Sequence, residues 1–117
     1  MNVTIQTQGF DITPPIGARV HRQVNKLLQT YAEDIVSVEV YLRDLNGPKG
    51  GPDKQVGIRI HVRHLPPQMV MTTEADLYKA IDRSAARAGR AVERAIGRFR
   101  RIRRRGLHHF GVVPSQA

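Results

Sequence analysis

A long segment near the C-terminus carries an apolar repeat and a basic repeat at the same helical period. Its basic residues follow one another three or four positions apart, which places them within roughly 100° of arc on a helix. They are Lys79, Arg83, Arg87, Arg90, Arg94, Arg98, Arg101 and Arg105, and are called the basic stripe below. A similar arc almost opposite is apolar: Leu77, Ile81, Ala85, Ala88, Val92, Ala95, Ile96 and Phe99. The segment predicts one helix from about residue 74 to 104, long enough to project past a small domain.

The net charge of the chain is concentrated in this segment. The chain has 19 Lys and Arg against 10 Asp and Glu, a formal net charge of +9. Residues 79–105 hold 11 basic and 2 acidic side chains, whereas residues 1–78 hold 8 of each. All of the excess (11 minus 2, or +9) therefore lies in the predicted helix, which indicates an acidic partner.

The pattern of the charges favours nucleic acid as that partner. Basic side chains three and four apart repel one another, so a helix selected only for solubility would mix them with acids. Arginine, which dominates the stripe, grips phosphate with two parallel hydrogen bonds and stacks on bases. Two alternatives are weaker: a merely solvated helix face, and a helix lying on a membrane. Membrane binding would use the apolar arc of the helix, but this arc is rich in alanine and is also needed to cover the strands.

Alternating segments predict four strands, at residues 2–8, 35–43, about 54–64 and 68–72. In the second of them, Val36, Val38, Val40 and Leu42 are expected on the inward face. Thr13-Pro14 predicts the start of a first helix that reaches about Tyr31, and the pattern Thr73-Glu74-Ala75-Asp76 predicts the cap of the second. The first helix carries a basic flank, which makes a second candidate RNA-binding set: Arg19, Arg22 and Lys26.

The order of these elements predicts an α+β fold of β-α-β-β-β-α type. Both helices need an apolar surface and each strand offers one, so a two-layer sandwich with a four-stranded sheet and two helices packed on one face buries all of them. Residues 1–105 are expected to form a single domain. Residues 106–117 have no periodicity and are expected to form a flexible C-terminal tail.

Several site types find no support in the residues. The chain has no Cys, which excludes disulfides and thiolate chemistry. His61 and His64 are expected on opposite faces of a strand, the pair His108-His109 has no carboxylate nearby, and the glycine-rich loop at 46–53 lacks the ending of a phosphate-binding loop. No nucleophile, acid and base combination stands out, so we expect no enzyme, no cofactor, no metal and no small-molecule substrate. The N-terminus has no signal-peptide pattern and no segment is apolar enough to span a membrane, so a cytoplasmic protein is expected.

The expected outer face of the sheet bears on the kind of nucleic acid. It offers Tyr41 as its aromatic residue among polar and basic side chains. RNA-recognition sheets stack bases on several exposed aromatics, so base-specific stacking is not expected here. Recognition through backbone charge and shape, as for structured RNA, is favoured.

Several segments resemble the ribosome hibernation-promoting factor family, also called ribosome-associated inhibitor A or ribosomal subunit interface protein. They are DITPPI at residues 11–16 with the helix after it, the valine strand at 37–42, and EADLYKAIDR at 74–83. The likeness covers about residues 1–105. It implies a fold related to double-stranded RNA-binding domains, and a ribosome-associated translation inhibitor that binds the decoding region of the small ribosomal subunit and blocks mRNA and transfer RNA in stationary phase or stress.

Position by position, the resemblance implies that basic residues after the matching motif contact ribosomal RNA: Lys79, Arg83, Arg87, Arg90 and Arg94. Arg98 and Arg101 are added by the stripe itself. The chain lacks the dimerisation domain of long family members, so a monomer off the ribosome is expected. Whether it promotes or opposes ribosome dimerisation stays open at this point. So does the alternative of a general structured-RNA-binding or RNA-chaperone module that acts away from the decoding site.

Overall fold

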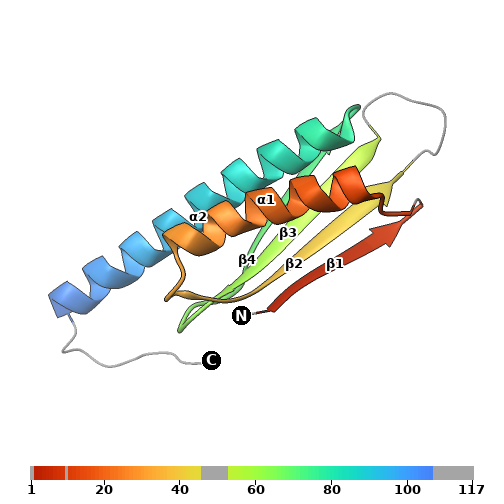
Figure 1. Ribbon diagram of the computed structural model, residues 1–117. Coiled ribbons are helices and arrows are strands. Elements are labelled where there is room, and N and C mark those ends of the chain that lie inside the picture. The colour runs from red at the N-terminus through yellow and green to blue at the C-terminus, as the bar shows by residue number, and fades with distance from the viewer. Residues whose placement is uncertain (1, 10, 46–52, 107–117) are drawn as a thin grey trace.

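A computed structural model describes residues 2–9, 11–45 and 53–106 of the chain, and the side chains of all of these except Arg105 and Gly106. The elements run in the order β1 (Asn2–Gln8), α1 (Pro14–Thr30), β2 (Ile35–Asp44), β3 (Lys54–Val62), β4 (Gln68–Glu74) and α2 (Leu77–Gly106). Figure 1 shows the two helices side by side over one face of the sheet. The predicted α+β two-layer fold is confirmed.

The sheet has the strand order β1-β2-β3-β4. β1 pairs with β2 in parallel, which α1 makes possible as the crossover connection. The pairs β2–β3 and β3–β4 are antiparallel. In this register Val40 lies opposite Ile58, and Ile58 lies opposite Val70, so apolar side chains form continuous rows on the face that the helices cover.

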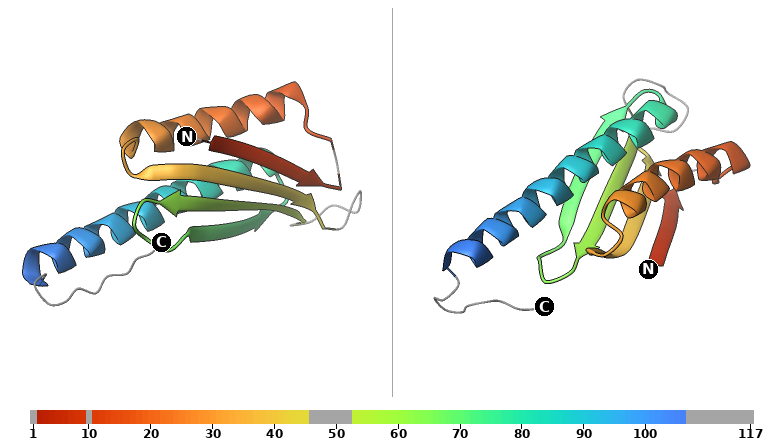
Figure 2. Two further views of the ribbon diagram at one scale, coloured as in Figure 1. Left: turned by 90° about the horizontal axis from the view of Figure 1, so that it is seen from below. Right: turned by 60° about the vertical axis from the view of Figure 1, so that its left-hand side comes forward.

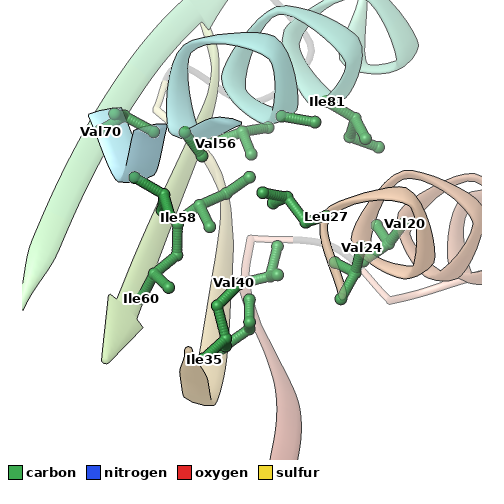
Figure 3. Close-up of a cluster of buried hydrophobic side chains, with 14 of the residues drawn as sticks. Val20, Val24, Leu27, Ile35, Val40, Val56, Ile58, Ile60, Val70 and Ile81 are labelled. Carbon is green, nitrogen blue, oxygen red and sulfur yellow. The ribbon is translucent and has the colours of Figure 1, made fainter. Parts of the chain in front are cut away.

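The first helix begins and docks as its sequence predicts. The hydroxyl of Thr13 accepts a hydrogen bond from the backbone N–H of Ile16 at 3.4 Å, and Pro14 occupies the first helical position, where its missing N–H is not needed. Three residues at helical spacing, Val20, Val24 and Leu27, are buried against the sheet. Figure 3 shows them facing Val40 and Ile58 across the core.

The second helix is continuous from Leu77 to Gly106 and includes Gly89 and Gly97. It begins three residues later than predicted, because residues 73 and 74 continue β4 by pairing with Gln55 and Lys54. The capping residue is therefore Asp76 and not Thr73. The Asp76 carboxylate accepts a hydrogen bond from the N–H of Tyr78 at 2.9 Å, and its carbonyl accepts one from Ala80 at 3.0 Å.

A register irregularity at the start of β2 corrects one predicted face. The pairing shifts between Ile35 and Ser37, so Ile35 is 2% exposed, whereas Val36, predicted to point inward, is 44% exposed. An extra residue at a bulge reverses the alternation on its N-terminal side. Val38, Val40 and Leu42 beyond the bulge are buried as predicted.

The third strand ends at Val62, two residues earlier than predicted. His64 lies in the following turn with a φ of 68°, a left-handed conformation that is uncommon outside glycine. The strand argument applied to His61 and His64 therefore does not hold for His64. Within residues 2–9, 11–45 and 53–106, no group of three or more His, Cys, Asp or Glu side chains is placed to hold a metal ion.

Two predicted features lie outside the described residues. They are the glycine-rich loop at 46–52 and, from residue 107 on, the predicted tail with its histidine pair; Gly106, expected in the tail, is the last residue of α2. In the part of the chain that the structure describes, no helix is both long and apolar enough to cross a membrane.

Candidate nucleic-acid interface

The packing of α2 turns the basic stripe away from the core. Ala88 and Val92 are fully buried and Ile81 is 2% exposed, which anchors the apolar side of the helix against the sheet and α1. The stripe occupies the opposite side, and its described side chains are all exposed: Lys79, Arg83, Arg87, Arg90, Arg94, Arg98 and Arg101. Of the two opposed arcs that the sequence predicts, the apolar arc is thus docked on the domain and the basic arc is exposed to solvent.

Two stripe residues make contacts with the sheet. Arg83 forms an ion pair with Glu74 at the end of β4. The guanidinium of Arg87 donates to the carbonyl of Met71 at 2.6 Å and to the hydroxyl of Thr72 at 3.1 Å. These contacts hold both side chains against β4, so part of their hydrogen-bonding capacity is used within the protein.

The positive charges of the other described stripe residues are not compensated by acidic side chains. Among the described residues, none forms an ion pair or a side-chain hydrogen bond with Lys79, Arg90, Arg94, Arg98 or Arg101. Five positive charges on one side of a helix raise the local potential and attract anions. Because the five lie in line along α2, the arrangement matches a row of phosphates.

The three basic side chains of α1 likewise include one that is bonded within the described part of the protein and two that are not. Arg19 binds Asp82 of α2 at 2.8 Å and lies over the ring of Tyr78, with its guanidinium carbon 5.0 Å from the ring centre. The amide of Gln23 donates to the other oxygen of Asp82 at 2.9 Å. Arg19 is thus part of a clamp between the two helices, and its predicted RNA contact has to compete with that clamp.

The other two α1 residues are open to a ligand. Arg22 and Lys26 are exposed and have no ion-pair partner in residues 2–9, 11–45 and 53–106. They lie one and two turns from Arg19, on the flank of α1 that the clamp turns toward α2. Because α1 lies beside α2 (Figure 2), these two residues add positive charge to the helical side of the molecule.

The outer face of the sheet differs from the helical face. Arg59 lies 3.8 Å from Glu39, and Arg43 donates to Gln55 at 3.4 Å. The hydroxyl of Tyr41 donates to Glu39 at 3.0 Å, which raises the pKa of Tyr41 above its ordinary value. A shallow hollow of about 280 Å³ lies over Gly57, between Tyr41 and two methionines of β4. One aromatic residue, already hydrogen-bonded, does not make a base-stacking sheet.

Sequence reasoning missed two parts of this surface. It assigned no role to Asp82, whose clamp is recognisable only once α1 and α2 are placed side by side. It also left out the arginines of α2 that lie off the stripe, Arg100, Arg103 and Arg104, because they break the helical period. A simple count of basic residues over 98–104 would have singled them out.

Comparison with known protein families identifies a match. Residues 3–100 match the family model described as "Sigma 54 modulation protein / S30EA ribosomal protein". The chain belongs to this family. The match spans most of the chain and confirms the resemblance found in the sequence.

Several solved structures are similar to the chain, among them one from Thermus thermophilus and one from Coxiella burnetii. No curated protein sequence matches it. The N-terminal domain of Protein Y from Thermus thermophilus is 25% identical, with a TM-score of 0.67 over 80% of this chain and 98% of that one. A ribosomal subunit interface protein from Coxiella burnetii is 15% identical, with a TM-score of 0.70 over 83% of this chain and 99% of that one. The second likeness supports the fold alone.

Proposed function

We propose that the protein binds ribosomal RNA of the small ribosomal subunit through the basic stripe of α2 and holds the ribosome in an inactive state. The single observation that carries the proposal is the row of exposed, uncompensated basic side chains on the docked helix, in a member of the S30EA ribosomal protein family. The protein then acts by occupying a site and not by catalysis.

The proposed site on the subunit is the decoding region, where bound protein would exclude mRNA and transfer RNA. Folded RNA fits the exposed side of α2 better than single-stranded RNA does. This side is a rigid, charged helix and has no aromatic side chains on which unpaired bases could stack. In this proposal Arg90, Arg94, Arg98 and Arg101 contact phosphates, and Arg22 and Lys26 contact them from α1. Lys79, Arg83 and Arg87 contribute at the β4 end, the last two after releasing or sharing their present partners.

Sedimentation and competition test the proposal. The protein should co-sediment with purified small subunits, and transfer RNA bound to programmed subunits should displace it. If about six phosphates are neutralised, affinity should fall roughly a thousandfold between 50 and 200 mM salt. Equal affinity for an unrelated RNA duplex of the same length, with no displacement by transfer RNA, would support a general RNA-binding module instead.

A further inference from the structure

The end of α2, residues 98–104, differs from the rest of the helix in where its charges lie. It extends past the edge of the sheet (Figures 1 and 2). It holds five arginines and no acid. At about 100° per residue, Arg98 and Arg101 continue the stripe, Arg100 and Arg104 lie beside it, and Arg103 lies roughly opposite its centre. Positive charge therefore covers more than half of the circumference of this end. One of the five, Arg100, lies 3.9 Å from the carboxylate of Asp34, and the other four have no ion-pair partner among the described residues.

The apolar side of the helix end is also uncovered. Phe99 is the last residue of the apolar arc to contact the body of the domain. Its ring stacks on the ring of His64 in the β3–β4 turn, with the two ring centres 6.3 Å apart. The guanidinium carbon of Arg103 lies 5.7 Å from the centre of the Phe99 ring. Ile102, nearly one turn further, is 65% exposed. The side of the helix that is buried between residues 80 and 96 thus becomes free surface at residue 102.

A charge distribution of this kind fits a cleft better than a flat surface. When a helix lies on a flat anionic surface, such as a lipid bilayer or one face of a folded RNA, only the charges on one side are neutralised. Arg103 would then stay on the far side, over the ring of Phe99 and one turn from Arg100, and no phosphate would neutralise its charge. A groove between two RNA backbones presents phosphates to both sides of the helix at once.

We propose that residues 98–104 insert into a cleft of folded RNA lined by phosphates on both sides, whereas residues 79–94 lie against a single RNA surface. Insertion engages Arg100, Arg103 and Arg104 as well as the stripe, and it removes the exposed Ile102 from water. The inference rests on the proposed RNA-binding function and adds a second mode of contact at one end of the same helix.

Salt dependence of binding separates the two modes. Arg100→Gln with Arg103→Gln removes two charges off the stripe, and Arg90→Gln with Arg94→Gln removes two charges on it; glutamine keeps the helical propensity of each site. Binding to purified small ribosomal subunits is measured from 50 to 200 mM KCl. We expect each pair to weaken binding at least tenfold at 100 mM and to lower the log–log salt slope by about two, because each phosphate that is no longer neutralised lowers it by close to one.

The outcomes distinguish the inference from the function on which it rests. If only the on-stripe pair changes affinity and slope, the helix end lies on a flat surface and the inference is overturned, while the proposed function stands. If neither pair changes them, the proposed function fails together with the inference. Weaker binding by both pairs supports both.

Chemical access gives an independent readout. Because the chain has no Cys, Ile102→Cys creates a single thiol at an exposed position that the fold does not need. Its alkylation rate should fall at least tenfold when the protein is bound to small subunits. Thr4→Cys, on the exposed outer face of the sheet, serves as the control and should slow less than twofold. An unchanged rate at position 102, or equal slowing at both positions, would overturn the insertion.

Discussion

The two solvent-facing sides of the molecule, the helical side with the basic stripe and the outer face of the sheet, carry charge in different ways. On the sheet, Arg59 lies beside Glu39 and Arg43 bonds to Gln55. On α2, five stripe residues have no such partner among the described residues. Both sides are exposed, so exposure alone does not explain the difference.

The difference indicates what each side is for. An exposed ion pair such as that of Arg59 with Glu39 adds little stability, about 0–1 kcal/mol, but it compensates the charge of the arginine. Leaving like charges unpaired costs a few tenths of a kcal/mol per neighbouring pair and brings no benefit within the folded chain. The unpaired charges of the helical side are what the proposed binding of an anionic partner requires, and the sheet side lacks such a row.

The largest expected effect comes from breaking the core that supports both sides. Ile81 is 2% exposed and lies on α2 opposite the stripe. Ile81→Asp would bury a charge without a partner, which costs several kcal/mol and is comparable to the whole stability of a small domain. We expect loss of the cooperative thermal transition, followed by circular dichroism.

The matched control is the same substitution at the other end of the same helix. Ile102 is 65% exposed, so Ile102→Asp should keep the melting transition within a few degrees of the unmodified chain. Equal loss of structure in both variants would show that α2 is stabilised by its own sequence and not by docking, and the division into a docked and a free side would be wrong.

The next effect is on binding and compares the two sides directly. Arg90→Glu with Arg94→Glu reverses two charges on the stripe, and Arg43→Glu with Arg59→Glu reverses two on the outer sheet. The net charge changes equally. A charge-assisted hydrogen bond is worth about 1.5–3 kcal/mol, so we expect the first pair to weaken binding to small subunits at least a hundredfold.

The sheet pair should weaken binding less than tenfold, through the change in overall charge alone. Arg90 and Arg94 are better probes than Arg83 and Arg87, because the latter two bond to β4 and their loss would also disturb the edge of the sheet. Comparable losses of affinity in the two pairs, measured by the same sedimentation assay, would mean that binding follows net charge and not the direction of the stripe.

The smallest effect concerns the clamp between the helices. Asp82→Asn removes the ion pair with Arg19 and weakens the bond from Gln23, so the free energy of unfolding should fall by about 1 kcal/mol in urea. Binding to small subunits should instead strengthen slightly, because an acid next to the stripe is gone and Arg19 is released.

Glu93→Gln is the control for this variant. Glu93 is an exposed acid of the same helix that forms no ion pair among the described residues. It should strengthen binding as Asp82→Asn does and leave stability unchanged. If stability falls equally in both variants, Asp82 does not act as a clamp.

Most of the fold could be predicted because the periodic segments are long and consistent with one another. The opposed arcs of α2, the cap at Thr13 and the alternation from Val38 to Leu42 each point to the same two-layer arrangement, and the structure confirms them. The errors occur at the ends of elements. The bulge at Ile35 and the extension of β4 to Glu74 depend on pairing between strands, which local periodicity does not contain.

The candidate site was predictable in position but not in detail. Spacing alone placed the stripe outward, because a helix with one apolar side has to expose the other. Spacing could not distinguish Arg90, which is free of partners among the described residues, from Arg87, which donates to the carbonyl of Met71. That distinction depends on which strand forms the edge beside α2, and the same holds for Arg19 and its clamp on Asp82.

Directed cleavage of ribosomal RNA tests the central claim most directly. A hydroxyl-radical source is attached to Ala86→Cys, next to the stripe on the exposed side of α2, and in a second sample to Thr4→Cys on the outer sheet. Both proteins are bound to small subunits and the cleaved nucleotides are mapped. The account predicts strong cuts from position 86, clustered in the decoding region, and weak cuts from position 4. Cuts from position 4 that equal or exceed those from position 86 would contradict it.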